Sequence, residues 1–536
     1  MKKYFLILCI FNSILLSAQV PVIEWQKTIG GNQKDWGIRT IKTQDNGYLI
    51  CGETQSSVSG DKTIPLKGVS DYWIVKTDSL GIIEWQKDIG GSDYDVPSVL
   101  LQTSDGGYLI GGNSLSDISG DKTENTHGFN DIWVLKLDGN GEIIWQNTIG
   151  GSFTDILSSI IQTPDGGYLL GANSVSNSSE DKSEDNIGFS FGLPYYTYYD
   201  YWIIKINSLG TIEWDNTIGT KDNDILTSVI NASDGGYIIG GYSNCDDSGD
   251  YNGIHIGGYD CWIIKVDTYG NILWQKTIGG TNKDQLTTII NTSDGGYLLG
   301  VISNSNISGN KTANSKGGDD FWVIKIDYQG NILWDKTIGG IGTEVINSIS
   351  KDNNDNYYIS GSSNSNISGD KTETSRGGYD CWFVKINYLG NLLWNKTIGG
   401  SGNEYGDSLT VVSENNLLLA SSSNSNISGD KTENSDGDYD FWLIKLTPEN
   451  LITTRFNGAI VSVYPNPTTK TLTVSLLKNY INLDVFVTNM LGQKVQQEQF
   501  GNASEIRFDL IGENGVYFVE VCNENKERVT FKVVKE

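Results

Sequence analysis

The chain has 536 residues, enough for more than one domain, and it contains 64 glycines, 15 tryptophans, 27 tyrosines and 15 phenylalanines. This composition suits many short strands joined by tight turns and argues against a largely helical fold. The formal net charge of −27 argues against nucleic acid and anionic lipid as partners, because both are polyanions, and it is compatible with cation binding or with simple solubility.

The first 18 residues, MKKYFLILCIFNSILLSA, combine two lysines, an apolar stretch and small residues at the end. This order is typical of a secretory signal peptide, and we expect cleavage between Ala18 and Gln19. Cys9 lies inside the apolar stretch, too early for lipid attachment at the cleavage point. No later segment reaches the ~18 apolar residues that a membrane helix needs, so no transmembrane segment is predicted.

A repeat dominates residues 19–446. Tryptophans open close variants of W-x-K-T-I-G-G at steps of 60 or 69 residues, at Trp25, Trp85, Trp145, Trp214, Trp274, Trp334 and Trp394. Each copy contains four strand-like runs, which in the second copy are residues 95–103, 108–112, 132–137 and 143–149. These runs are β-branched or aromatic and are bounded by turn residues. Four strands per copy predict the blades of an all-β propeller.

The two ends of the array predict how the propeller closes. The first copy begins with a fourth strand alone, residues 22–29, and the last copy ends with its third strand, residues 441–446. Pairing of these strands completes one composite blade and leaves no open sheet edge. The sequence therefore predicts a closed seven-bladed β-propeller with its long loops on one face. It resembles uncharacterised exported propellers that carry T-x-D-G-G-Y and Y-W-I-V-K-L-D segments.

Two acidic positions recur in every copy. The one before the third strand is Asp71, Asp131, Asp200, Asp260, Asp320, Asp380 and Asp440, and the one that leads the first strand is Asp35, Asp95, Asp155, Asp224, Asp284, Glu344 and Glu404. A residue needed in every blade suits a structural role better than one active site. Because short carboxylates accept backbone N–H bonds in turns, we expect these acids to hold the blades together.

The long loops repeat the segment Ser-Gly-Asp-Lys-Thr, with its aspartate at Asp61, Asp121, Asp370 and Asp430. Oxygen-bearing side chains close to a glycine are compatible with a Ca²⁺ site. The lysine beside each aspartate competes with a cation, so a self-bonded turn is the alternative. No other cofactor is predicted.

Two neighbouring copies depart from the repeat. The third gains nine residues in its long loop, many of them aromatic, and the fourth replaces the Lys-Thr pair. We expect a ligand to contact this patch, which consists of Phe191, Tyr195, Tyr196, Tyr198, Tyr199, Asp246, Asp247, Tyr251 and His255. Aromatic rings suit sugar faces, and the polar groups suit sugar edges. The alternative is that the inserted aromatics pack against their own blade.

Two cysteines, Cys245 and Cys261, bracket the long loop of the fourth copy. Export permits disulfides, and these positions end two strands that should be antiparallel neighbours, so a bridge is predicted. Cys381 occupies the same repeat position as Cys261 without an evident partner, so a small buried apolar residue is the alternative.

Residues 461–536 form a different, tryptophan-free unit after an expected linker at residues 447–460. Four motifs occur there in order: Tyr464-Pro465-Asn466-Pro467, the segment MLGQKV, a GVYFV segment with Gly515 and Tyr517, and a terminal KVVK with Lys532 and Lys535. Together they resemble the type A C-terminal sorting domain of the type IX secretion system. The resemblance implies a small Ig-like sandwich, a translocon and a sortase as partners, and a secreted or outer-membrane surface location.

The repeat unit carries no recognisable catalytic motif. No Ser/His/Asp or Cys/His arrangement, H-E-x-x-H or phosphate-binding glycine loop can be placed, so no catalytic residue is predicted. We expect a monomeric binding module for a glycan or another extracellular polymer. Two alternatives stay open: a structural or adhesive protein that binds other proteins, and a polysaccharide hydrolase or lyase that works with carboxylates alone.

Overall fold

The computed structural model describes residues 20–187, 198–244, 248–413, 416–448, 454–456, 459–464, 468, 470–489, 493–524 and 528–535. The chain divides into two compact units, Met1–Leu446 and Thr447–Glu536. The expected signal peptide lies outside the described residues. Among the residues of these ranges, no helix is long and apolar enough to cross a membrane.

The first unit consists of repeated four-stranded sheets, each built from consecutive strands. Their strands are β2 (Asp35–Lys42), β3 (Tyr48–Thr54), β4 (Asp71–Thr77) and β5 (Ile83–Ile89); β6 (Asp95–Gln102), β7 (Tyr108–Ser114), β8 (Asp131–Leu137) and β9 (Ile143–Ile149); β10 (Asp155–Gln162), β11 (Tyr168–Ser174), β12 (Asp200–Ile206) and β13 (Ile212–Ile218); β14 (Asp224–Asn231), β15 (Tyr237–Ser243), β16 (Asp260–Val266) and β17 (Ile272–Ile278); β18 (Asp284–Asn291), β19 (Tyr297–Ser303), β20 (Asp320–Ile326) and β21 (Ile332–Ile338); β22 (Glu344–Lys351), β23 (Tyr357–Ser363), β24 (Asp380–Ile386) and β25 (Leu392–Ile398).

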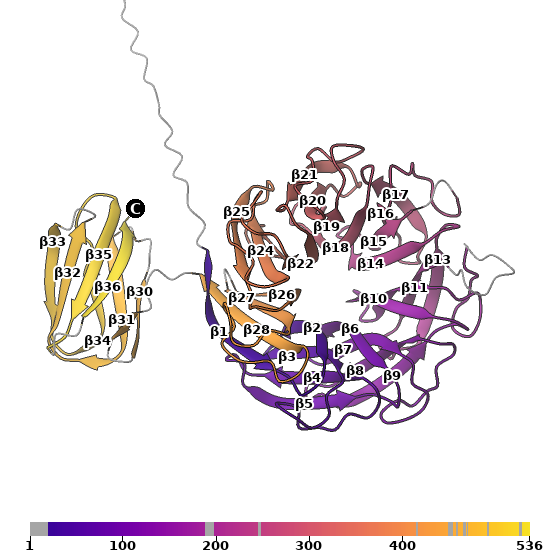
Figure 1. Cartoon of the computed structure of the whole chain (residues 1–536), viewed down its shortest axis with the longest axis horizontal. Coiled ribbons are helices and arrows are strands. Elements are labelled where there is room, and N and C mark those ends of the chain that lie inside the picture. The colour runs from indigo at the N-terminus through magenta and orange to yellow at the C-terminus, as the bar shows by residue number, and fades with distance from the viewer. Residues whose placement is uncertain are drawn as a thin grey trace, which may run out of the picture. The chain divides into compact units, whose positions relative to one another are not determined.

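All of these sheets share one antiparallel register. Asp95 pairs with Ser114, and Ser114 pairs with Asp131, so the two repeated acids lie at the same end of the sheet as the long loop. We call this the loop end. Figure 1 shows the sheets side by side in a ring around a central opening, with the first strand of each sheet innermost. This arrangement is β-propeller-like.

The apolar core lies between successive sheets. Strands such as β8 are buried along their whole length, because a neighbouring sheet covers each face. One core cluster joins Ile263 of β16 to Leu299 and Trp322 of the following sheet. Another joins Ile29 and Phe441 to the sheet that contains β3 and β4. Each sheet is therefore stabilised by its two neighbours.

The N-terminal strand lies beside the last strand of the repeat unit. The sheet order is β1 (Pro21–Ile29), β28 (Asp440–Pro448), β27 (Asn416–Ser423) and β26 (Glu404–Ser413). The Gln26 amide of β1 donates to the Asp430 carbonyl at 2.7 Å and accepts from the Trp442 indole at 2.9 Å. In the second copy the same indole bond reaches Gln146 of the fourth strand. Strand β1 thus occupies the place of a fourth strand.

The second unit consists of two four-stranded sheets. Their orders are β29 (Thr454–Phe456), β30 (Ala459–Tyr464), β31 (Thr471–Tyr480) and β34 (Ala503–Asp509), and β33 (Lys494–Phe500), β32 (Leu483–Asn489), β35 (Gly515–Cys522) and β36 (Arg528–Lys535). One apolar core joins both sheets, with Val474 and Phe508 from the first and Val519 and Phe531 from the second. Inside this unit the Tyr517 hydroxyl donates to the Glu513 carbonyl at 2.6 Å.

Candidate functional site

The repeated acids are buried at the loop end of each sheet. Asp95 accepts the Gly91 N–H at 2.6 Å and the Ser116 hydroxyl at 3.0 Å. Asp131 accepts the N–H groups of His127 at 2.5 Å and Gly128 at 3.2 Å. These bonds fix the connections that enter the first and third strands, so the structural role expected for the acids is confirmed.

Acids of adjacent sheets face one another. Burial raises the pKa of Asp200 in β12 to about 7. Burial also raises the pKa of Asp224, at the start of the next sheet, to about 7, and the charge of Asp200 adds to this rise. Burial likewise raises the pKa of Asp440 to about 7, and the charge of Asp35 in the next sheet adds to this rise. In all four residues Oδ1 is buried and has no hydrogen-bond partner among the described residues, so each pair is costly to ionise.

The lysine of the Ser-Gly-Asp-Lys-Thr loop turns into its own sheet. Lys431 is 2% exposed, and its Nζ donates to the hydroxyls of Ser423 at 3.0 Å and Ser435 at 2.8 Å. The same Nζ lies 5.7 Å from the Trp442 ring centroid. Burial lowers the pKa of Lys431 to about 8, and Asp440 and Glu404 oppose that shift. The lysine is therefore a buried counter-ion for the two acids of its sheet.

The aspartates beside these lysines, Asp61, Asp121, Asp370 and Asp430, connect successive sheets. Asp430 accepts the Gly399 N–H at 3.1 Å and pairs with Arg376 Nε at 3.0 Å, both from the preceding copy. Asp61, Asp121 and Asp370 bind the equivalent glycine N–H groups. In the part of the chain that the structure describes, no cluster of three or more His, Cys, Asp or Glu residues could hold a metal. The calcium role of these four aspartates stays a prediction.

The sheet of β14–β17 has a tyrosine where the others have the buried lysine. Tyr251 is 2% exposed, its ring centroid lies 5.3 Å from that of Trp262, and its hydroxyl accepts from Thr277 at 2.7 Å. This burial corrects the prediction that Tyr251 binds ligand, because its ring faces are covered. His255 stays partly exposed, with Nδ1 3.4 Å from the Asp260 carboxylate.

The other residues of the predicted patch are only partly described. Phe191, Tyr195, Tyr196, Asp246 and Asp247 lie outside the described residues. The Tyr198 carbonyl accepts from the Asn186 amide at 2.8 Å, and the Tyr199 N–H donates to Asn223 Oδ1 at 3.1 Å. Both tyrosines are half-buried. These contacts place the two backbones without bringing either ring to His255, so the patch stays a prediction.

Cys261 has a free thiol, which corrects the predicted bridge to Cys245. The side chain is fully buried in the core between its sheet and the next one, and its Sγ contacts the Asp284 carbonyl at 3.5 Å. Cys381, at the same repeat position, is also free and buried. In these two copies the cysteine therefore serves as a small buried apolar side chain. Cys245 lies outside the described residues.

A group of half-buried aromatic side chains, which the sequence reasoning missed, lies at the loop end close to the ring centre. We call it the aromatic rim, and it consists of Trp36, Tyr379, Tyr405 and Tyr439. The Trp36 ring centroid lies 4.6 Å from Tyr439 and 5.0 Å from Tyr405, and Tyr405 lies 6.0 Å from Tyr379. Each rim residue directly follows or precedes one of the repeated acids, and this position was the available signal.

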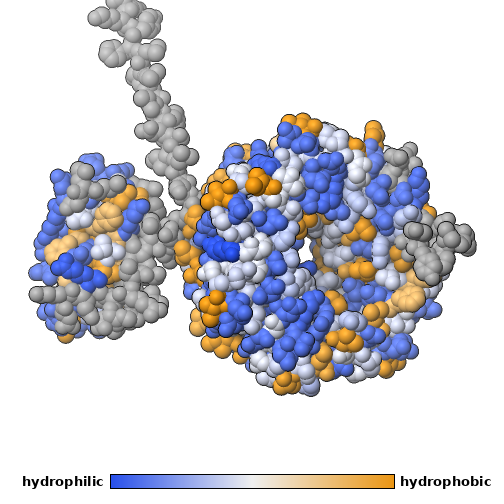
Figure 2. Space-filling model, viewed as in Figure 1, coloured by the Kyte–Doolittle hydropathy of each residue, from blue (hydrophilic) through white to orange (hydrophobic). Residues whose placement is uncertain are grey.

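Further along the same innermost strands is a cavity of about 330 Å³. Its lining includes Arg39 of β2, Asp407 of β26, Asn347 of β22, Gln285 of β18 and Tyr242 of β15. Figure 2 shows the ring open at its centre. Burial raises the pKa of Asp407 to about 6, and the Arg39 charge opposes the rise. We call this space the axial cavity.

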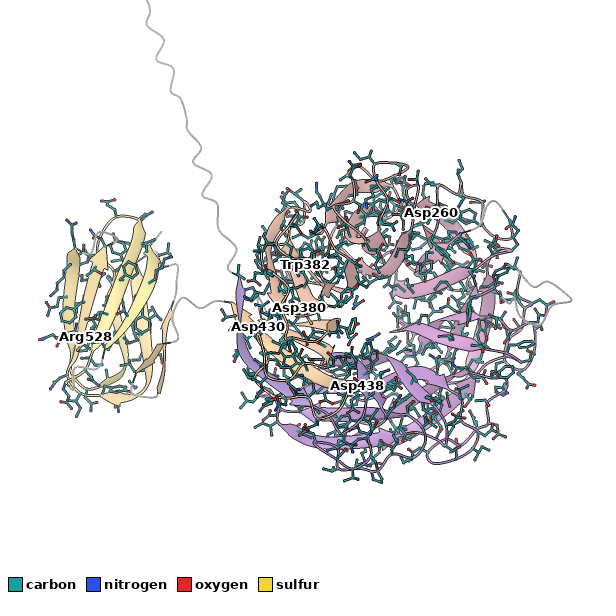
Figure 3. The ribbon with its side chains drawn as sticks, viewed as in Figure 1. Asp260, Asp380, Trp382, Asp430, Asp438 and Arg528 are labelled. Carbon is teal, nitrogen blue, oxygen red and sulfur yellow. The ribbon has the colours of Figure 1, made fainter. Side chains whose placement is uncertain are left out.

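One acidic and one basic side chain lie next to the rim. Asp438, in the loop that leads into β28, is exposed, and Figure 3 shows it beside the central opening. Lys34 is the basic neighbour of the rim, with Nζ 4.9 Å from the Trp36 ring centroid. The rim and the axial cavity together offer flat rings, the Arg39 guanidinium, the Asp407 carboxylate and several amide and hydroxyl groups. This set can stack on a ring and hydrogen-bond to its edges.

The C-terminal unit matches a known family. Residues 462–536 match the family described as the secretion system C-terminal sorting domain. Of the motif residues predicted for it, Gly515 and Tyr517 lie in β35 and Lys532 and Lys535 lie in β36. Tyr464 ends β30, and the three residues after it lie outside the described ranges. The sorting domain is confirmed, and it indicates secretion through the type IX system to the cell surface or extracellular space.

Two curated proteins are similar to parts of this chain. "Regulatory protein FlaEY" of Caulobacter vibrioides is 23% identical over 222 residues, which are 39% of this chain and 23% of that protein. An uncharacterized WD repeat-containing protein of Acanthamoeba polyphaga mimivirus is 25% identical over 166 residues, 27% of this chain and 12% of that protein. The chain thus spans less than a quarter of the length of these curated relatives.

Several solved structures are similar at low identity. BBS1N, solved in complex with ARL6DN, has a TM-score of 0.41 at 10% identity and covers 81% of this chain and 99% of its own. Puromycin hydrolase has a TM-score of 0.43 at 9% identity, with coverage of 94% and 62%. Synechocystis apocarotenoid oxygenase has a TM-score of 0.39 at 11% identity, with coverage of 73% and 88%.

Proposed function

We propose that the chain is a secreted binding module in which a closed seven-bladed β-propeller, residues 19–446, binds an extracellular glycan at the aromatic rim. Residues 1–18 act as a cleaved signal peptide, and residues 447–460 act as a linker. The sorting domain engages the translocon, and a sortase removes it. The order β1-β28-β27-β26 supports closure of the ring, because β1 supplies the strand that the last copy lacks.

The aromatic rim is the observation that carries the binding role. Its rings come from three adjacent sheets, those that contain β2, β22 and β26. Contacts between the rings fix their orientation before a ligand arrives, which lowers the entropic cost of binding. Aromatic faces of this kind stack on the C–H faces of sugars, and the secreted location brings the rim to extracellular polymers.

Replacing Trp36 by alanine is expected to lower the affinity for an insoluble glycan about tenfold, because the central ring of the rim is lost. Retention on cellulose, chitin and β-1,3-glucan measures this with the full secreted chain. Tyr269→Ala is the matched control, since Tyr269 is 77% exposed and lies in the turn between β16 and β17, at the opposite end of the sheet. Equal retention of both variants at unchanged melting temperature would contradict a glycan site at the rim.

A different observation favours an adhesive role in which the loop face binds other proteins. The long loops place one aliphatic side chain at the same position in several copies, each 61–64% exposed: Val58, Ile118, Ile307, Ile367 and Ile427. Exposed apolar groups that recur around a face are typical of protein contact. Substitution of these five residues by serine would reduce cell adhesion and leave glycan retention unchanged if the adhesive role is the correct one.

Deleting residues 461–536 is expected to keep the repeat unit inside the cell envelope. The signal peptide still directs export across the inner membrane, whereas the sorting domain supplies recognition at the outer membrane. Immunoblots of periplasmic, surface and medium fractions measure the distribution. Deletion of residues 1–18 is the comparison, because that variant should stay in the cytoplasm. A truncated chain that reached the medium at the normal level would show that another part of the chain directs sorting.

A further inference from the structure

The axial cavity contains two charged side chains that do not pair with each other. Arg39 Nε donates to the Ser98 carbonyl at 3.1 Å, and Nη1 donates to the Ile38 carbonyl at 3.3 Å. These bonds hold the guanidinium in place and leave the Nη2 hydrogens for another acceptor. Among the described residues, no ion pair within 4.0 Å joins Arg39 to an acid.

Asp407 belongs to the sheet next to that of Arg39, and its carboxylate is also held in place by hydrogen bonds. Its Oδ2 accepts the Ser422 N–H at 3.1 Å and the Ser422 hydroxyl at 2.6 Å. The Ser422 oxygen in turn accepts the Gly37 N–H of β2 at 3.1 Å. The second carboxylate oxygen of Asp407 is left for a donor from the cavity. A fixed cation with spare donors and a fixed anion with a spare acceptor thus line one polar space.

A sugar hydroxyl satisfies both groups, because it accepts from Arg39 and donates to Asp407 at once. An anionic ligand would pair with Arg39 but would be repelled by the Asp407 carboxylate. It would also be repelled by the whole chain, whose net charge is −27. The amides of Asn347 and Gln285 add further donors and acceptors to the lining. The chemistry therefore favours a neutral polyhydroxylated group.

The position of the cavity decides which part of a glycan can reach it. Asp407 follows the rim residue Tyr405 by two positions on β26. Arg39 follows Trp36 by three positions on β2. A chain that lies across the loop face touches the rim alone, whereas a free end can enter along the ring axis. The volume of about 330 Å³ lies at the small end of the range for ligand pockets, which suits one or two sugars.

We infer that the axial cavity binds the terminal sugar of a neutral glycan, with its hydroxyls bridging Arg39 and Asp407 while the aromatic rim stacks on the next sugar. This inference rests on the proposed function, and it means that the protein recognises the ends of glycan chains. Arg39 and Asp407 then determine specificity for the end, and Trp36 contributes affinity for the chain.

Calorimetric titration of the full secreted chain with cello-, laminari-, malto- and mannohexaose tests the inference. Asp407→Asn and Arg39→Met are expected to lower the affinity for the bound hexaose about tenfold at unchanged melting temperature, because each removes a charge-assisted bond. Tyr269→Ala, outside both the cavity and the aromatic rim, is expected to leave affinity unchanged. For longer chains of the same sugar, the amount of protein bound per mole of chain ends should stay constant as the chain length increases.

The outcomes separate the two proposals. End recognition would be overturned if the cavity variants bound with the normal affinity, or if the protein bound per chain end rose with chain length. The glycan role would stay intact in that case if Trp36→Ala still lost retention. Preference for tetragalacturonate over every neutral hexaose would overturn the neutral class. If no neutral hexaose bound, the end-reading inference would fail, and retention on the insoluble polysaccharides would decide the proposed function separately.

Discussion

Replacing Lys431 by methionine is expected to lower the free energy of unfolding of the repeat unit by about 3–5 kcal/mol, since the change leaves buried charges without their counter-ion. Lys431 is 2% exposed, and the charges of Asp440 and Glu404 in its sheet act on its ammonium group. Methionine keeps most of the side-chain volume over the Trp442 ring and removes only the ammonium group. Thermal and urea unfolding, monitored by tryptophan fluorescence, measure the loss.

Lys221→Met is the matched control, because Lys221 is exposed, and its loss is expected to change stability by no more than about 0.5 kcal/mol. The defect of Lys431→Met should shrink at pH 5, where Asp440, whose pKa is raised to about 7, takes up a proton in place of the lost cation. A defect of equal size at pH 5 and pH 8 would show that Lys431 acts through packing rather than through its charge.

The strands of the repeat could be predicted closely from the sequence because their pattern is local. Residues 143–149 were predicted as a strand and form β9, and residues 95–103 became β6. Each run is bounded by glycine or aspartate at a turn, and repetition supports each assignment with the other copies. The buried acids were also predicted correctly in role, since a short carboxylate before a strand has nearby N–H groups to accept.

The aromatic rim could not be predicted in the same way because it forms between distant parts of the chain. Trp36 and Tyr405 are separated by most of the repeat unit, and only the ring of sheets brings them to 5.0 Å. In sequence each is a single departure from its repeat. The burial of the loop lysine could not be predicted for a related reason: its approach to the buried tryptophan depends on how the loop folds back over the sheet.

The stability of the repeat unit is expected to fall as pH rises from 5 to 8. The pKa values of Asp200, Asp224 and Asp440, each about 7 in the folded chain, are raised by burial above the ordinary value of 3.8. The folded chain therefore keeps protons that the unfolded chain has lost. Stabilisation from these groups is complete below about pH 4 and is lost as pH rises through about 7.

Asp45, at the opposite end of the sheet, titrates outside this window. Burial alone would raise the pKa of Asp45, but the bonds from Lys76 and Thr43 lower it to about 2. Its contribution to stability is therefore present above about pH 4 and is lost only in stronger acid. Unfolding in urea at half-unit steps of pH measures the slope, and a free energy of unfolding that rose between pH 5 and 8 would contradict the role given to the buried pairs.

The variant Asp224→Asn tests whether the pair Asp200 and Asp224 causes the fall in stability between pH 5 and 8. Asparagine keeps an oxygen for the Thr220 N–H, which Asp224 accepts at 2.6 Å, and its amide hydrogens occupy the place of the unpartnered Oδ1 next to Asp200. The variant copies the protonated acid at every pH, so its free energy of unfolding should exceed that of the original chain by about 1–3 kcal/mol at pH 8 and by little at pH 5.

Asp438→Asn is the control because Asp438 is exposed. If both variants followed the pH profile of the original chain, the facing acids of β12 and β14 would not be the groups that titrate. A flatter profile for Asp224→Asn alone would show that the junctions between sheets, rather than the surface acids, couple this ring to pH.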